Sequence, residues 1–218
     1  TREFVASRDH WFRPVALANA PDGCLWVCDM YREIVEHPWS IPEPIKSKVN
    51  LDAGNDRGRL WRIAPTDFKP RPSLKMSTAT TAELVTLLAH NNRWHRDTAA
   101  RLLHQRHDLK AVPALEKLLH EATQPVGRLT ALRVLVGLVP AEKMPWQVAL
   151  ADGDPLVRAE ALVQIGIAFG TGTIPAQLRP TIEKLTTDPS AEVRFRVGLL
   201  LPHWTKAGRP PVLLSLAK

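Results

Sequence analysis

One loop of this 218-residue chain gathers most of the side chains that could take part in chemistry. Within eleven consecutive positions it carries a histidine, three carboxylates, an arginine and two aromatic rings. Ionisable and aromatic groups at this density fit a binding surface, and long loops without regular structure are often functional. The residues are Asp29, Tyr31, Arg32, Glu33, Glu36, His37 and Trp39.

His37 is the leading single candidate in this loop, because it stands among carboxylates and aromatic rings. In the alternative interpretation it is a loop-packing histidine that hydrogen-bonds Glu33 or Glu36. Another histidine pair, His104 and His107, has the i, i+3 spacing of one helix face, but the His-Glu-x-x-His pattern of zinc proteases does not occur. We therefore predict no metal site in this chain.

The loop, residues 30–56, connects two strands of a predicted antiparallel sheet. Apolar runs on both sides of Pro21-Asp22-Gly23 predict a β-hairpin, because Asp-Gly supplies the positive φ angles of a tight turn. A third strand is expected at Gly58–Ala64 and an edge strand at Glu3–Ser7, which makes four strands. So small a sheet has little to pack against, so we expect it to belong to a larger assembly.

Strand alternation assigns the residues of the second strand to two faces. Leu25, Val27 and Asp29 are expected on one face, and Cys24, Trp26 and Cys28 on the other. The two cysteines would then lie roughly 13 Å apart, beyond the ~7 Å limit for a disulfide. No CxxC or CxxCH motif is present, so the chain encodes neither a zinc ribbon nor covalent haem attachment.

The segments Ser7-Arg-Asp-His-Trp-Phe-Arg-Pro-Val15, Asp29-Met-Tyr-Arg-Glu-Ile-Val-Glu-His-Pro-Trp-Ser-Ile-Pro42 and Gly58-Arg-Leu-Trp-Arg-Ile63 resemble a known family. They look like the closing blade of six-bladed β-propellers of the glucose/sorbosone dehydrogenase type. More narrowly, they resemble large multi-domain proteins of planctomycetes and verrucomicrobia named as membrane-bound dehydrogenases with a haem-binding domain. The resemblance covers residues 1–66. In that family a propeller is followed by helical repeats and a cytochrome-c-like module with a CxxCH motif.

The resemblance implies an extracytoplasmic oxidoreductase that oxidises a sugar-like or alcohol substrate. It implies a quinone of the PQQ type and a c-type haem in the full-length protein, neither of them held by this chain, which is expected to be catalytically silent in isolation. Its partners would be the remaining propeller blades and the cytochrome-c-like module of the same polypeptide. The motif positions that form the candidate site are Asp9, Arg13, Asp29, Arg32, Glu33 and His37. Asp29, Arg32 and Glu33 either line the propeller channel or form a structural network that holds the loop against the blade.

After the sheet, the hydrophobic period changes from two to about 3.6 residues. Residues 1–68 are therefore assigned to the blade, 69–81 to a linker and 82–218 to helical repeats. Thr80-x-x-Glu83 is a capping box that opens the first helix. Four helix pairs are predicted: 82–90 with 93–106, 112–122 with 126–138, 145–151 with 155–169, and 179–187 with 190–202. A fifth repeat is expected to begin near Pro210, so the chain reads as part of a longer protein.

The second helices of these pairs share a register. Asp152-Gly-Asp-Pro-Leu-Val-Arg158 and Asp188-Pro-Ser-Ala-Glu-Val-Arg194 superimpose closely and resemble the HEAT repeat signature. The repeat-structural residues are Arg96, Arg128, Asp152, Arg158, Asp188 and Arg194. The predicted fold is thus α+β and multi-domain, an antiparallel propeller blade followed by an α-α superhelix.

Charge is uneven along the chain, whose formal net charge is +7. Residues 1–70 contain ten Lys/Arg and ten Asp/Glu, whereas residues 71–218 contain nineteen and twelve. The excess of positive charge in residues 71–218 could bind nucleic acid or an acidic protein partner. Pairing with acidic residues inside the repeats accounts for the in-register arginines, so nucleic-acid binding is the weaker hypothesis. Nucleotide-binding and serine-hydrolase motifs are absent, and no apolar run approaches the ~20 residues of a membrane span. The main alternative to an oxidoreductase is a non-enzymatic interaction scaffold.

Overall fold

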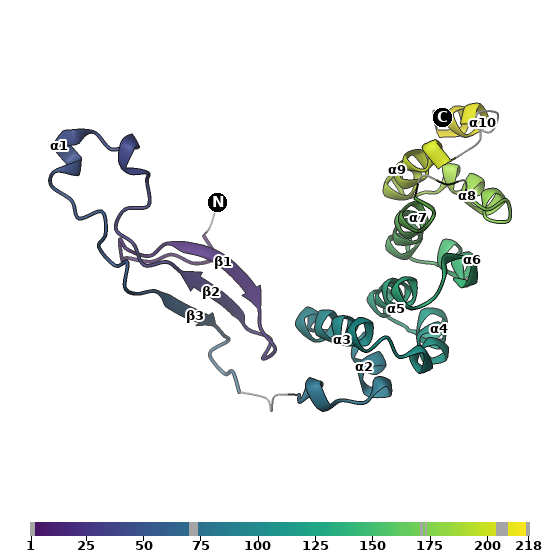
Figure 1. Cartoon of the computed structure of the whole chain (residues 1–218), viewed down its shortest axis with the longest axis horizontal. Coiled ribbons are helices and arrows are strands. Elements are labelled where there is room, and N and C mark those ends of the chain that lie inside the picture. The colour runs from purple at the N-terminus through teal and green to yellow at the C-terminus, as the bar shows by residue number, and fades with distance from the viewer. Residues whose placement is uncertain (1–2, 70–73, 171, 173, 204–208, 217–218) are drawn as a thin grey trace. The chain divides into compact units, whose positions relative to one another are not determined.

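The computed structural model describes residues 3–69, 74–170, 172, 174–203 and 209–216 (Figure 1). Within these ranges it contains ten α-helices and one three-stranded antiparallel sheet, a mixed α and β structure. The chain divides into two units, Thr1–Leu74 and Lys75–Lys218. Residues 70–73 of the predicted linker lie outside the described residues, as do the side chains of residues 209–211.

The sheet has the strand order β1-β2-β3, formed by β1 (Pro14–Asn19), β2 (Leu25–Asp29) and β3 (Arg59–Ile63) (Figure 1). The predicted hairpin is confirmed: Gly23 has a φ of 85°, and the Asp22 carboxylate accepts a hydrogen bond from the Cys24 amide at 2.9 Å. The register pairs Val27 with both Leu17 and Trp61, so the predicted division of β2 into two faces is also confirmed.

The predicted fourth strand at residues 3–7 is not formed. Phe4 and Val5 instead line a groove over the sheet face that carries Leu17 and Val27. The ladder is irregular where this strand would have paired, since the register shifts at the start of β1 and Pro14 has no amide hydrogen to donate.

Two short helical segments lie within the long loop. They are η1 (Pro38–Ser40) and the one-turn helix α1 (Glu43–Lys46). Pro38 is the first residue of η1 and Pro44 the second residue of α1, where the fixed φ of proline suits the start of a helix. The loop therefore has local order although its side chains bury little surface.

The second unit is built of antiparallel helix pairs (Figure 1). The α-helices are α2 (Thr81–Leu87), α3 (Arg93–Arg106), α4 (Val112–Glu121), α5 (Pro125–Leu138), α6 (Trp146–Leu150), α7 (Pro155–Phe169), α8 (Arg179–Lys184), α9 (Ala191–Leu199) and α10 (Arg209–Leu216). Short 3₁₀ turns precede or connect them: η2 (Met76–Thr78), η3 (Leu109–Ala111), η4 (Ala141–Lys143), η5 (Leu185–Thr187) and η6 (Leu201–His203). A helix overlaps each of the eight predicted helical ranges. The predicted capping box is confirmed, because the Thr80 amide donates to Glu83 Oε2 at 2.7 Å and the Glu83 amide to Thr80 Oγ1 at 3.3 Å.

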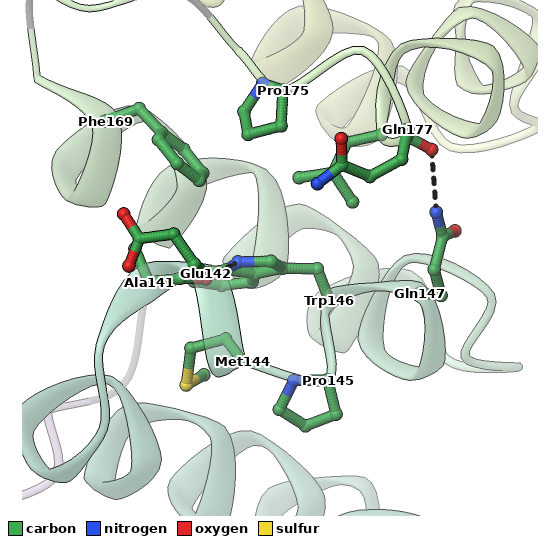
Figure 2. A pocket seen from close by; sticks show the side chains of 10 residues that line it. Ala141, Glu142, Met144, Pro145, Trp146, Gln147, Phe169, Pro175 and Gln177 are labelled. Atoms are coloured by element: carbon green, nitrogen blue, oxygen red, sulfur yellow. Dashed lines mark hydrogen bonds between the residues drawn. The ribbon is translucent and has the colours of Figure 1, made fainter.

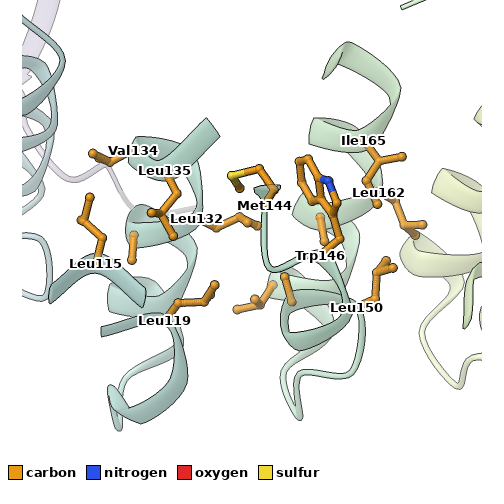
Figure 3. Close-up of a cluster of buried hydrophobic side chains, with 14 of the residues drawn as sticks. Leu115, Leu119, Leu132, Val134, Leu135, Met144, Trp146, Leu150, Leu162 and Ile165 are labelled. Carbon is orange, nitrogen blue, oxygen red and sulfur yellow. The ribbon is translucent and has the colours of Figure 1, made fainter. Parts of the chain in front are cut away.

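The helices form two rows. In one row α2, α4, α6 and α8 contact each other in succession, and in the other α3, α5, α7 and α9 do so. A continuous apolar core fills the space between the rows, from Leu84 to Val212 (Figure 3). Leu103, Leu132 and Leu162 belong to three successive pairs and are almost completely buried, so each pair depends on its neighbours for its core. Among the described residues, no helix has the length and apolar character needed to cross a membrane.

Candidate functional site

Asp29 is the centre of the cluster that holds the base of the long loop. Its side chain is buried at the end of β2 and accepts four hydrogen bonds. Oδ1 accepts from the backbone amides of Arg13, at 2.8 Å, and Tyr31, at 3.0 Å. Oδ2 accepts from Arg59 Nε, at 2.7 Å, and Trp61 Nε1, at 2.9 Å. Four donors occupy the lone pairs of this carboxylate, which leaves it little capacity to bind a substrate.

Arg59 is the cationic partner in this cluster. Besides Asp29, it binds Asp9 Oδ2 through Nη1 at 2.6 Å. Its guanidinium lies 4.1 Å from the centre of the Tyr31 ring and 5.0 Å from that of Trp61, both within cation–π range. Arg59 is not among the site residues predicted from the sequence. Strand pairing could have indicated it, because the register places Arg59 directly opposite Asp29.

The hydrogen bonds decide the protonation state of Asp29. Burial alone would raise the pKa of its carboxyl group, since a buried charge loses hydration. The donors Trp61, Arg13, Arg59 and Tyr31 outweigh that effect and lower the pKa from 3.8 to about 2. Asp29 therefore remains ionised at neutral pH, and its environment is that of a fixed structural anion, whereas a general acid needs a raised pKa.

Arg13 and Arg32 bind backbone carbonyl groups. Arg13 Nη2 donates to the Glu33 carbonyl at 2.8 Å, which ties the segment before β1 to the start of the loop. Arg32 Nη1 donates to the carbonyls of Gly54 and Arg57, which lie at the other end of the loop. The two guanidiniums thus close the loop at its base.

Gly54 makes this closure possible. Its φ is 83°, and a Cβ atom built on it would lie 2.5 Å from the Tyr31 carbonyl oxygen and 3.4 Å from the Trp11 ring. Only glycine fits so close an approach of two backbone segments. From the sequence, Gly54 is predicted only to be part of a turn.

Glu33 and His37 lie outside the Asp29 cluster and are exposed. His37 Nδ1 accepts a hydrogen bond from the Trp39 amide at 3.3 Å, and the two rings meet edge to face at 6.3 Å. His37 therefore caps η1 instead of bonding Glu33 or Glu36. Of the six candidate residues, the structure brings Asp9 and Asp29 together on Arg59, uses Arg13 and Arg32 as braces, and leaves Glu33 and His37 facing solvent.

The in-register arginines of the helical unit form a second, repeated arrangement. Each donates through Nη1 to the carbonyl oxygen six residues earlier, at 2.6 to 2.8 Å. The donor and acceptor pairs are Arg96 with His90, Arg128 with Ala122, Arg158 with Asp152, and Arg194 with Asp188. The common bond explains the shared register: each arginine closes the turn before its own helix.

Two of these arginines also bind the following pair. Arg128 forms a two-pronged ion pair with Asp152, at 2.7 and 2.8 Å, and Arg158 forms one with Asp188, at 2.8 and 2.9 Å. Both pairs are largely buried. Burial by itself raises the pKa of Asp152 and Asp188, but the hydrogen bonds from the arginines and from the following backbone amides lower it overall. These residues link one pair to the next, and we call the arrangement the arginine ladder.

A cavity of about 180 Å³ lies in the helical unit beside α6 (Figure 2). Trp146 and Phe169 form much of its wall, and Glu142 contributes a carboxylate at its edge. The Trp146 indole nitrogen donates to the Ala141 carbonyl at 2.7 Å, so it is already satisfied. Gln147 Nε2 donates across the cavity edge to the Gln177 carbonyl at 3.0 Å.

The chemistry that these residues can perform is limited by their internal bonds. Within the described ranges, no group of three His, Cys, Asp or Glu side chains is arranged to hold a metal ion. A c-type haem needs a CxxCH motif, and the spacing of Cys24 and Cys28 does not provide one. Asp9 and Asp29 are bonded to Arg59, and Arg13 and Arg32 to backbone carbonyls, whereas Nη2 of Arg59 is buried with no hydrogen-bond partner among the described residues.

Residues 1–67 match a family model described as "Domain of unknown function (DUF7133)". This range contains the whole sheet, the long loop and all six candidate residues. No curated protein matches the chain.

Proposed function

We propose that this chain is part of an extracytoplasmic oxidoreductase and is not catalytic by itself. In this proposal residues 1–68 form the closing blade of a β-propeller of the glucose/sorbosone dehydrogenase type. Residues 69–81 form a linker, and residues 82–218 a HEAT-like α-solenoid that spaces or docks a c-type haem module. The oxidoreductase chemistry rests on the sequence resemblance to the planctomycete and verrucomicrobial membrane-bound dehydrogenases.

The observation that carries the proposal is the exposure of apolar side chains on both faces of the sheet. Leu17 on one face and Leu60 on the other are both mostly exposed, and so is Phe4 in the groove. A three-stranded sheet with two uncovered apolar faces is marginal in water. Neighbouring blades would cover both faces, which is how a propeller packs its sheets.

The Asp29 cluster supports a non-catalytic role for this part of the propeller. Its carboxylates accept hydrogen bonds within the chain and its guanidiniums donate them, apart from the buried Nη2 of Arg59. The cluster thus fixes the base of the loop and leaves the tip free to contact another part of the protein. A substrate and a quinone would then be bound mainly by parts of the polypeptide outside residues 1–218.

The experiment compares the full polypeptide with residues 1–218. Each is purified, supplied with PQQ and an aldose, and assayed for reduction of an artificial dye and for the absorbance of reduced c-type haem. We expect dye reduction and haem reduction by the full polypeptide and neither by residues 1–218. Dye reduction by residues 1–218 alone would contradict the non-catalytic role, and a full polypeptide that binds neither haem nor quinone would contradict the oxidoreductase.

A scaffold that only binds other proteins is the second candidate. It is favoured by the internal pairing of Asp9, Asp29, Arg13 and Arg32, which gives these four candidate residues structural roles. Stable capture of an acidic protein by the full polypeptide, without haem or quinone, is the result that this hypothesis predicts. Nucleic-acid binding would instead show an affinity that falls steeply with salt.

A further inference from the structure

One position of the arginine ladder has a methyl group where the others have a carboxylate. In the two complete rungs, an arginine of one helix pair holds an aspartate of the next pair through Nε and Nη2. The register places Ala122 where Asp152 and Asp188 stand, because each of the three offers its carbonyl oxygen to Nη1 of the arginine six residues later. Opposite Arg96, the chain therefore supplies no carboxylate at this position.

The Arg96 side chain is nevertheless held in the same way as its equivalents. Its Nη1 donates to the carbonyls of His90 and Asn91, at 2.7 and 2.8 Å, just as Nη1 of Arg128 and of Arg194 donates to two successive carbonyls before its own helix. Within the described part of the chain, Nε and Nη2 of Arg96 have no partner. A fixed guanidinium thus presents two parallel donors, the arrangement that binds a carboxylate in two places.

The turn opposite Arg96 has the backbone of a complete rung. The φ and ψ angles are −61° and 123° at Ala122 and −57° and 139° at Asp188. Two residues later they are −86° and 126° at Gln124 and −80° and 120° at Ser190. In the complete rungs the amide of this later residue donates to the aspartate at 2.8 Å. The Gln124 amide has no acceptor among the described residues, so a third donor is unused beside the same position.

We propose that these three donors form a site for a carboxylate group from outside the chain. We call the site the open rung and define it as Nε and Nη2 of Arg96, the Gln124 amide and the Ala122 methyl group. A carboxylate in the place of the missing aspartate accepts two bonds from the guanidinium and one from the amide, as the Asp152 carboxylate does. The N-terminus of α5, a helix of fourteen residues, adds a favourable field for a negative charge.

The open rung is accessible from solvent. Arg96 and Ala122 are half-buried, and Gln124 is exposed. The shared chemistry of its occupants is a carboxylate, which a free small acid and the Asp or Glu side chain of a peptide both supply. The inference does not depend on the oxidoreductase proposal.

The test follows the Gln124 amide and the Arg96 Nε–H group by heteronuclear NMR of the 218-residue chain. Sodium acetate replaces sodium chloride at constant pH and ionic strength. We expect both signals to shift with one saturable dependence on acetate, and neither to shift with acetamide, which has nearly the same shape and no charge. The second probe is the peptide acetyl-Gly-Asp-Gly-amide. A response to the peptide as well as to acetate supports an acidic side chain as the occupant, and a response to acetate alone supports a free small acid.

Variants separate the open rung from general salt effects. Ala122→Asp places a carboxylate of the chain itself on Arg96, so it should raise Tm and weaken acetate binding about tenfold or more. Ala122→Asn, which has the same size without the charge, should raise Tm less. Arg96→Gln should abolish the acetate response of the Gln124 amide, whereas Arg101→Gln, on the exposed side of α3, should leave it unchanged.

Three results would overturn the proposal. They are a lack of any saturable response to acetate, a stronger response to inorganic phosphate than to acetate, and unchanged acetate binding by Ala122→Asp. The third result decides the matter even if Arg96→Gln fails to fold, because Ala122→Asp keeps the Nη1 bonds by which Arg96 closes its turn.

Discussion

Removing one partner of the arginine ladder should destabilise the helical unit strongly. The side chains of Arg158 and Asp188 are only 12% and 4% exposed, and two hydrogen bonds of 2.8 and 2.9 Å join them. Asp188→Asn leaves the Arg158 charge buried without a counter-charge, which typically costs about 3–5 kcal/mol of unfolding free energy. A protein of this size loses about 2–4 °C in Tm for each kcal/mol, so a decrease of about 10 °C is expected.

The chain offers a matched control for this change. Arg93 and Asp97 form an ion pair of the same type, with Nε–Oδ2 at 3.0 Å, but their side chains are 70% and 63% exposed. Asp97→Asn should cost less than about 0.5 kcal/mol, because water screens the pair. Thermal unfolding followed by circular dichroism at 222 nm compares the two variants.

A double-mutant cycle separates the pair from its context. Arg158→Met with Asp188→Leu removes both charges, so it should be less destabilising than the two single changes added together. The reasoning is refuted if Asp188→Asn and Asp97→Asn shift Tm equally, or if the effects of Arg158→Met and Asp188→Leu are additive.

Three other predictions concern the sheet unit and the first helix. The pKa of Asp29, 3.8 when unfolded and about 2 when folded, contributes about 2 kcal/mol of stability that is complete above about pH 5 and is lost as pH falls from about 4 to 2. Hydrogen exchange of the β2 amides measures the local stability of wild type and of Asp29→Asn. The difference in stability between the two proteins should become smaller as pH falls over that range, and a difference that stays constant would contradict the prediction. Gly54→Ala should speed amide exchange at the loop base, because its Cβ would overlap the Tyr31 carbonyl, whereas Gly153→Ala, with no atom within 4 Å, should not. Thr80→Ala should lower the stability of the helical unit by about 1 kcal/mol in urea unfolding, since the capping box loses its hydroxyl, while Thr78→Ala serves as control.

Local patterns in the sequence determined the positions of most elements. The hairpin was predicted from Asp22-Gly23, because the positive φ of Gly23 that the turn needs is a local property of these two residues. The four helix pairs followed from apolar periodicity and from caps such as Thr80, which act within one turn. The common spacing of the arginines also followed from sequence, because each one bonds a carbonyl only six residues away.

Tertiary structure decided which of these residues meet. Arg59 lies thirty positions from Asp29 and joins it only through strand pairing, and Gly54 reaches Tyr31 only when the loop closes. The strand predicted at residues 3–7 was wrong. An edge strand forms only against a neighbouring strand with regularly spaced backbone hydrogen-bonding groups, and the register of β1 shifts at its start. The pairing of Arg158 with Asp188 crosses two repeats, and its burial comes from the packing of one helix pair on the next. Such contacts depend on the three-dimensional path of the chain, so residue type and spacing alone could name the candidates but could not state which of them are bonded, buried or left open.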